Sequence, residues 1–447
     1  MSFHQFIPSE PPKRNHDSSG SGSASKRQRV YIPTRPSLIE ACKNNDLQDV
    51  EYYLQHNADV NQVNHRGQTP LFIASLNNNI EIIRLLLSVE NIDVNPVADL
   101  GFTPLSITRS VAIVHMLIEA GANINQRDHL GRTLLMNVSQ RGRTEIVRIL
   151  IEHGADISVS SGHKTATYMA CEHGHAEIVR LLLAAGADIN QTNFRGKTLL
   201  RKASQYGYID VVRVLLEAGA NPNQVVNGET LVNGETPIYT ATRYGRHNVV
   251  RMLLEAGVEI NDMTAGANIT DTTLLYIASK KGYDETVRVL LEFGADVNQM
   301  NNIFTRATPL FIACQEGHVE TVRVLLEHGA NINQRDVAGQ TPLFAASHAG
   351  HTEVVRVLLI DKHILFGIKE ESGYTALKIA TLRNHVEIAQ MIQTAIKKRK
   401  LLLARIAHKN TVNVLNPNKG KLILKLSTHV LKQISKYNVE NKHKINF

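Results

Sequence analysis

Twenty histidines and three cysteines are the side chains of this 447-residue chain that first suggest an active site or a metal site. Cys42, Cys171 and Cys314 lie too far apart for a paired zinc-ligand spacing or a disulfide framework. No two histidines form the i, i+4 pair of an HExxH site, and the GxxxxGK[ST], strand-to-helix GxGxxG and GxSxG motifs are missing. We therefore expect no cofactor, no metal site and no enzyme.

The feature that organises these residues is an internal repeat. A Thr-x-Leu-x-x-Ala core recurs with a usual spacing of 32 to 35 residues. A helix-like apolar run such as EIVRLLL at 177 follows each core, and then a Gly/Asn turn such as GADIN at 186. The anchors of this core are Thr69, Thr103, Thr133, Thr165, Thr198, Thr236, Thr273, Thr308, Thr341 and Thr375.

Each unit is predicted to be a short helix, a Gly turn, a second helix and a polar loop to the next unit. Helices under about 12 to 15 residues are only marginally stable alone in water. Stacking should therefore bury one continuous ribbon of Leu, Ile and Val, with contacts between neighbouring units only.

The TPLF-x-A stretches at 69, 308 and 341, the GH-x-E stretches at 174 and 317 and the GAD-[IV]-N turns resemble ankyrin repeats. The pattern recurs about eleven times from roughly residue 35 to 396. The resemblance implies an all-α solenoid of ankyrin-type helix-turn-helix repeats with projecting hairpin loops. We divide the chain into a disordered basic segment (1–34), the repeat array (35–396) and a basic C-terminal extension (397–447).

Three departures from the family pattern are visible. The repeat at 101–130 lacks about three residues around Arg109 and Ser110, so its helix hairpin should be shortened. The loops before the seventh, eighth and ninth repeats are longer than the others, and they include NGETLVNGET at 227–236. The family's histidine in TPLH is replaced by aromatic residues: Phe72, Tyr168, Tyr239, Tyr276, Phe311 and Phe344.

Most of the reactive residues acquire structural explanations once they are placed on the repeat. The three cysteines follow the motif alanine, where other repeats carry Ser or Thr, which favours packing over a redox or nucleophilic role. The resemblance gives His175, His318 and His351 a role in bracing the helix hairpin. A row of arginines with a glutamate four residues on is either a ligand ladder or, as we favour, a solvated face with weak ion pairs.

A partner-binding surface is carried over from the family, whose variable positions lie at hairpin tips and on the inner helix before the Gly turn. We name the predicted residues the concave patch and expect them to hold an acidic peptide or protein surface, the alternative being ordinary solvated surface. They are Phe194, Arg195 and Lys197 at a tip, and Gln205, Tyr206, Arg243, Tyr244, Lys280 and Lys281 on inner helices.

Positive charge gathers at the two ends of the chain. Residues 1–36 contain six Lys or Arg against two acids, and residues 397–447 contain thirteen against one, so a net charge of +8 leaves an acidic middle. The clusters Lys13-Arg14 and Lys26-Arg27-Gln28-Arg29 resemble a bipartite nuclear-localisation signal, with Lys13, Arg14, Lys26, Arg27 and Arg29 as its cations and an import receptor as its partner.

The second helix of the last repeat runs into Lys397-Lys398-Arg399-Lys400, so we expect it to continue past the array as a cap. Leu401, Leu402, Leu403 and Ile406 should point inward at least in part. No motif is assigned to residues 417–447. No stretch approaches the roughly 18 apolar residues of a membrane span.

These observations predict an intracellular protein-interaction scaffold or adaptor, nuclear or cytoplasmic, that binds a protein partner through the concave face of the array. The alternative is a nucleic-acid-associated or chromatin-associated regulatory factor that uses the basic termini, and such binding would weaken steeply with salt.

Overall fold

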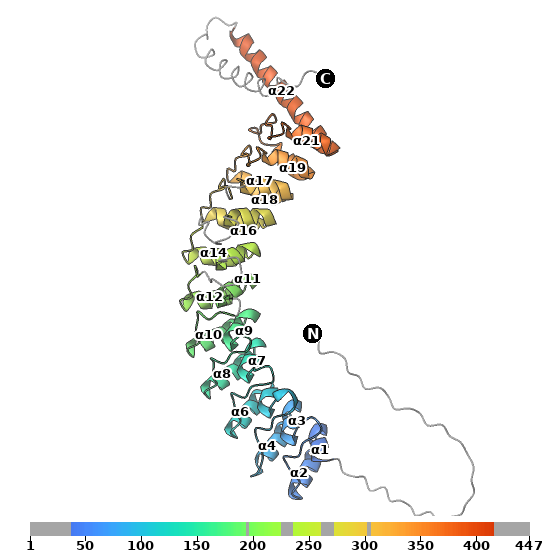
Figure 1. The fold of residues 1–447 in the computed structure, drawn as a ribbon, viewed down its shortest axis with the longest axis vertical. Coiled ribbons are helices and arrows are strands. Elements are labelled where there is room, and N and C mark those ends of the chain that lie inside the picture. The colour runs from blue at the N-terminus through green and yellow to red at the C-terminus, as the bar shows by residue number, and fades with distance from the viewer. Residues whose placement is uncertain (1–36, 194–195, 225–235, 261–271, 302–304, 415–447) are drawn as a thin grey trace, which may run out of the picture.

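The computed structural model describes residues 37–193, 196–224, 236–260, 272–301 and 305–414. These residues form pairs of antiparallel helices stacked into one curved column (Figure 1). The nuclear-localisation residues Lys13, Arg14, Lys26, Arg27 and Arg29, the loop residues Phe194 and Arg195, and residues 417–447 lie outside the described part.

The first helices of the pairs form one row along the column. These helices are α1 (Leu38–Asn44), α3 (Pro70–Asn77), α5 (Pro104–Ile107), α7 (Leu134–Gln140), α9 (Ala166–His173), α11 (Leu199–Tyr206), α13 (Pro237–Arg243), α15 (Leu274–Lys281), α17 (Pro309–Glu316), α19 (Pro342–Ala349) and α21 (Ala376–Leu382). The row lies on the concave side of the column from α1 to α11 in Figure 1.

The second helices form the other row. These helices are α2 (Leu47–Gln55), α4 (Ile80–Leu87), α6 (Val111–Glu119), α8 (Thr144–Glu152), α10 (Ala176–Ala184), α12 (Ile209–Glu217), α14 (His247–Glu255), α16 (Asp284–Glu292), α18 (Val319–Glu327), α20 (Thr352–Leu358) and α22 (Val386–Val414). This row lies on the convex side from α2 to α14 in Figure 1. The predicted all-α solenoid of about eleven repeats is therefore confirmed within the described residues.

The motif threonine begins each first helix from α3 to α21 as its N-cap. In α17, for example, the Thr308 hydroxyl accepts a hydrogen bond from the backbone N–H of Phe311, and Pro309 occupies the first turn, where no N–H is needed. Gly317 then ends α17 with φ of 84°, a left-handed conformation that glycine adopts without a Cβ penalty. The recurring Thr thus fixes where the first helices from α3 to α21 start, and Gly ends α9, α11, α15, α17 and α19 in the same way.

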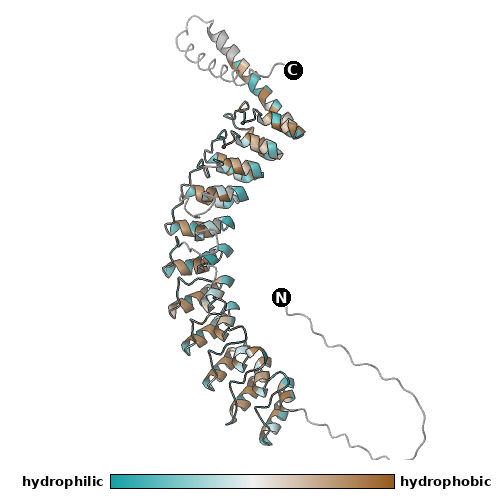
Figure 2. Cartoon of the chain, viewed as in Figure 1, coloured by the Kyte–Doolittle hydropathy of each residue, from teal (hydrophilic) through white to brown (hydrophobic). Residues whose placement is uncertain are grey.

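One continuous apolar cluster runs through the array from Leu38 to Ile392. Figure 2 shows these residues along the middle of the column, with hydrophilic residues toward the concave side. Leu, Ile and Val of each second helix supply most of the fully buried side chains, such as Leu290 and Leu325. This is the ribbon of core that the repeat pattern predicted.

Hydrogen bonds between the loops reinforce the stack. Adjacent hairpin loops are joined through their backbones, as where Glu371 N–H donates to the Ala338 carbonyl at 3.0 Å. A second row uses asparagine side chains. Asn333 donates to the His363 carbonyl at 2.9 Å and accepts from the Leu365 N–H at 2.8 Å, so one side chain joins two successive repeats.

The shortened repeat is confirmed. Helix α5 has four residues, and Thr108, Arg109 and Ser110 connect it to α6 in extended backbone. α5 and α7 hardly touch, whereas each other pair of neighbouring first helices in the described residues packs together.

Helix α22 continues to Val414, as its sequence predicted. Arg399 holds it to the preceding loop by donating to the carbonyls of Ile364 and Lys362. The prediction that these residues point inward at least in part is wrong for Leu401, which is 58% exposed. Leu402, Leu403 and Ile406 line a hollow beside the loop that precedes α21, although Leu402 is still 56% and Ile406 38% exposed. The physical reason is that α22 outruns the array, so no further described repeat lies beside these turns (Figure 1).

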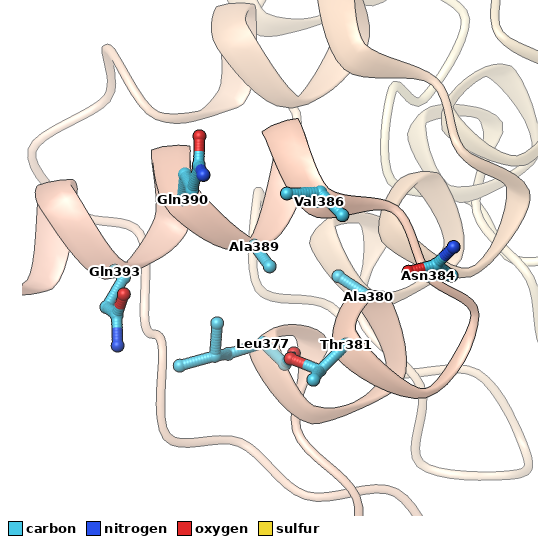
Figure 3. A pocket seen from close by; sticks show the side chains of 8 residues that line it. All are labelled: Leu377, Ala380, Thr381, Asn384, Val386, Ala389, Gln390 and Gln393. Atoms are coloured by element: carbon cyan, nitrogen blue, oxygen red, sulfur yellow. The ribbon is translucent and has the colours of Figure 1, made fainter.

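The end face of the last repeat shows how the column stops. A hollow of about 340 Å³ lies between α21 and α22, lined by Leu377, Thr381, Asn384, Gln390 and Gln393 among others (Figure 3). Inner repeats fill the corresponding space with the apolar residues of the next unit. Polar side chains at this face allow it to remain in contact with water, as terminal repeats of a solenoid require.

Candidate partner-binding surface

The concave patch is positioned by the ends of three successive first helices. Gln205 and Tyr206, Arg243 and Tyr244, and Lys280 and Lys281 stand seven and eight residues after the N-cap threonines of α11, α13 and α15. Because each helix has the same start and nearly the same length, equivalent residues of neighbouring repeats form a row. The three helices follow one another in the stack, since α11 packs against α13 and α13 against α15.

The exposed members of this row are two tyrosines and three cations. Tyr206 is 39% and Tyr244 is 44% exposed, and Arg243, Lys280 and Lys281 are exposed as well. Gln205 is half-buried. Lys197, also half-buried, lies in the loop before α11, where its backbone N–H donates to the Asn193 side chain.

A charged cluster beside the patch was missed by the sequence analysis. Glu172 at the end of α9 forms ion pairs with Lys164 at 2.6 Å and with Lys202 of α11 at 2.9 Å. Burial alone would raise the pKa of Glu172, but hydrogen bonds from both lysines outweigh it and hold the pKa below its ordinary value. The available signal was Lys202 itself, which stands where most repeats carry Ile, Met or Thr.

The cluster also supports an aromatic residue of the patch. Lys202 Nζ lies 4.8 Å from the centre of the Tyr206 ring, a cation–π distance. The same Nζ also forms the ion pair with Glu172. Burial would lower the pKa of Lys202, but the bond to Glu172 raises it, so the side chain stays charged. Tyr206 is therefore held in place before any partner arrives.

Tyr168 links this cluster to the neighbouring loop. Its ring is 1% exposed, and its hydroxyl accepts a hydrogen bond from Asn193 at 2.8 Å. Burial raises the pKa of this hydroxyl. At the position where the family pattern has histidine, a tyrosine hydroxyl thus forms the hydrogen bond to the loop that contains Asn193.

The GH histidines brace successive repeats rather than one hairpin, which corrects the role implied by the resemblance. His318 reaches the carbonyl of Lys280 at 3.0 Å, His351 that of Gln315 at 2.9 Å and His175 that of Gln140 at 3.1 Å. In the equivalent position, Arg246 Nε donates to the Gln205 carbonyl at 3.2 Å. The acceptors always lie seven residues after the motif threonine, so these bonds fix the backbone of Gln205 and Lys280 in the patch.

The arginine row of the second helices is engaged with acids. The observed pairs differ from the expected i, i+4 pairs, because they join residues three apart or neighbouring repeats. Arg288, for instance, lies 3.8 Å from Glu285 and 3.0 Å from Glu320 of the next repeat. This supports the solvated-face interpretation, and exposed pairs of this kind are each worth only about 0–1 kcal/mol.

The three thiols are buried, as their alanine-adjacent position predicted. Each is 0% exposed, and burial raises the pKa of Cys42 to about 12 and those of Cys171 and Cys314 as well. Because the thiolate is the reactive form, we expect no labelling of the native protein by an aromatic disulfide reagent at pH 8. Labelling should follow the urea unfolding curve measured by circular dichroism, and rapid reaction of one thiol without denaturant would contradict the packing role.

Within the described residues, no group of three or more His, Cys, Asp or Glu side chains could hold a metal ion. The described helices also include none that is both long and apolar enough to cross a membrane.

Stacked helix pairs, projecting loops and a concave row of exposed side chains define a repeat solenoid of the binding-scaffold class. A family model described as ankyrin repeats (three copies) matches residues 38–128, 107–193, 190–264, 263–336 and 336–400. The chain belongs to the ankyrin-repeat family, whose repeats are generally protein–protein interaction modules.

Individual relatives match only part of the chain. The putative ankyrin repeat protein YahD of Escherichia coli is 34% identical over 128 residues, which are 27% of this chain and 63% of YahD. The putative ankyrin repeat protein FPV022 of fowlpox virus is 29% identical over 120 residues, or 27% of this chain and 20% of FPV022. A probable serine/threonine-protein kinase of Dictyostelium discoideum is 31% identical over 186 residues, only 19% of that kinase.

Among solved structures, the crystal structure of the human ASB11 ankyrin repeat domain covers 52% of this chain and 100% of that domain, with 27% identity and a TM-score of 0.45.

Proposed function

We propose that this protein is a non-enzymatic scaffold or adaptor that holds a protein partner against the concave patch of α11, α13 and α15. The observation that carries the proposal is the row of Tyr206, Tyr244, Arg243, Lys280 and Lys281, all exposed and in register on successive repeats. Tyr and Arg are the residue types enriched at interface hot spots, and rigid rings lose little side-chain entropy on binding.

The chemistry of the patch favours an acidic partner surface. Three cations lie on α13 and α15. Glu172 on α9 is already paired with Lys164 and Lys202. In the next repeat the equivalent position is negatively charged, because it holds Glu316, which is exposed at the end of α17. The cations would attract an acidic surface and set its register, while the tyrosines supply apolar contact area.

The alternative of nucleic-acid binding receives no such support. Its basis was the basic termini, of which residues 1–36 and 415–447 lie outside the described part of the chain. The described basic residues from 397 onward lie on α22, where Arg399 already bonds to the loop carbonyls of Ile364 and Lys362. A nuclear or cytoplasmic location and an import receptor likewise stay predictions from the sequence.

We expect a quadruple alanine variant to bind the partner at least about 100-fold more weakly, because two or more hot-spot contacts are lost. The variant replaces Arg243, Tyr244, Lys280 and Lys281. Partners would first be captured from cell extract with the full chain and identified by mass spectrometry. Each purified partner would then be titrated against the wild-type chain and the variant by biolayer interferometry.

The matched control replaces three exposed cations and one exposed tyrosine elsewhere, Arg84, Arg180, Arg323 and Tyr374, and should keep wild-type affinity. Equal affinity of the patch variant and the wild type for the main partner would show that the patch is not the binding site. A steep fall of the association rate with added salt is expected for the wild type and the control variant, and a shallower one for the patch variant.

A further inference from the structure

The short helix α5 leaves a second recessed surface, which we call the α5–α7 notch. A cavity of about 600 Å³ lies where α5 ends early, and Phe102, Ile107, Arg109, Arg132, Asn137 and Arg143 are among its lining residues. Its volume is in the range of cavities that bind small ligands or a few peptide side chains. The loop at 128–132 bounds it on one side and the turn between α7 and α8 on another.

The shortness of α5 explains why polar side chains line the notch, where other repeats have apolar side chains. Asn137 stands four residues after Thr133, where α3, α9, α15 and α17 carry Ile or Met. In those repeats the side chain packs within the continuous stack of first helices. Since α5 and α7 hardly touch, Asn137 remains half-buried and turned to the cavity.

Arg143 has lost the acceptor that its position normally reaches. It occupies the same place in its repeat as His175, His318 and Arg246, which each donate to a carbonyl at the end of the preceding first helix. Helix α5 ends at Ile107, before that carbonyl would occur. Arg143 is exposed at the notch and forms no such bond within the described residues.

The charge of the notch is strongly positive. Four arginines, Arg109, Arg132, Arg141 and Arg143, line it together with a single acid, Asp128. Asp128 Oδ1 already accepts hydrogen bonds from the backbone N–H groups of Leu130 and Arg132 at 2.9 Å. None of the four arginines takes part in an ion pair among the described residues, unlike the arginines of the second helices.

Arg132, which lines the notch, also carries an unsatisfied donor. Its Nε atom is buried and has no hydrogen-bond partner within the described residues. Buried donors are nearly always satisfied, and an unsatisfied one at a binding surface is relieved when a partner brings an acceptor.

We propose that the α5–α7 notch binds a short acidic segment of a partner protein, in which Asp or Glu flanks a Leu, Ile or Phe side chain. The carboxylates pair with Arg141 and Arg143 at the rim, where guanidinium groups match carboxylates in bidentate geometry. The apolar side chain enters between Phe102, Ile107 and Leu130, of which Leu130 is 51% exposed. This site is separate from the concave patch of α11, α13 and α15, so one array offers two contacts to its partners.

The test uses the full-length chain and a phage-displayed library of random heptapeptides. The wild-type chain should enrich peptides that combine Asp or Glu with Leu, Ile or Phe. The same selection against Asn137→Phe, which fills the notch, should lose that enrichment, and its circular dichroism spectrum and melting curve establish that it is folded. The strongest peptide, labelled with fluorescein, would then be titrated by fluorescence anisotropy.

Arg141→Ala/Arg143→Ala should weaken binding of that peptide at least about tenfold, because the two truncations remove two charge-assisted hydrogen bonds to its carboxylates. Arg84→Ala/Arg180→Ala on the second helices removes the same charge outside both proposed sites and should leave the peptide affinity unchanged. The concave patch is tested with its own partner, so failure of one site is distinguishable from failure of the other.

Three results would overturn the proposal: no acid-enriched peptide, equal enrichment by Asn137→Phe, or equal affinity of the arginine variant. Displacement of every selected peptide by polyuridylate RNA at matched charge would also overturn it, in favour of a nucleic-acid site.

Discussion

Leu325→Ala should lower the free energy of unfolding of the array by about 3 kcal/mol, within the range of about 2–5 kcal/mol for deleting a fully buried leucine. Leu325 lies on α18 and is 0% exposed, and α18 packs against both α16 and α20. The vacated volume cannot be refilled easily, because neighbours on both sides are held by their own repeats.

The effect should extend beyond one repeat. In a solenoid, stability is approximately the sum of repeat terms and nearest-neighbour interface terms, so a weakened interface can separate the unfolding of the two flanking blocks. Urea titration followed by far-UV circular dichroism would show a lower midpoint and a shallower transition.

Leu326→Ala is the matched control, because it removes the same atoms from the next residue, whose side chain is only half-buried. Its loss should be clearly smaller. Equal losses in the two variants would contradict the assignment of Leu325 to the continuous core.

Gly317→Ala should destabilise the array by about 2 kcal/mol or more, for two separate reasons. Gly317 has φ of 84°, where an L-residue is strained, and the added Cβ would lie 2.7 Å from Cε1 and Nδ1 of the His351 ring. That ring also bonds the Gln315 carbonyl of the preceding repeat, so displacing it removes a bond between repeats.

A double-mutant cycle separates the two causes. His351→Ala alone should cost about 1 kcal/mol through the lost hydrogen bond. The double variant Gly317→Ala/His351→Ala should be less destabilised than the sum of the single changes, since the collision is gone while the backbone strain remains. Additive losses would show that the ring does not restrain the glycine, and urea titration of all three variants measures the result.

The sequence by itself determined the fold and the repeat boundaries, because they rest on local rules repeated many times. Thr308 caps a helix start and Gly317 ends it within one unit, and the apolar spacing of each second helix gives its buried face. The short α5 was also predictable, since three missing residues must shorten an element of fixed register. The chain places Tyr206, Tyr244 and Lys280 in one row for the same reason.

Only the tertiary structure decided which partners these residues have. The pairing of Glu172 with Lys202 and the reach of His351 to Gln315 depend on contacts between non-identical residues about one repeat apart. The lack of an equivalent bond from Arg143 to a carbonyl among the described residues follows from the short α5 of the preceding repeat. The exposure of Leu402 depends on α22 outrunning its neighbours. A repeat pattern shows what the units share, whereas these features arise where one unit differs from the next, and their energies exist only once the two units are stacked.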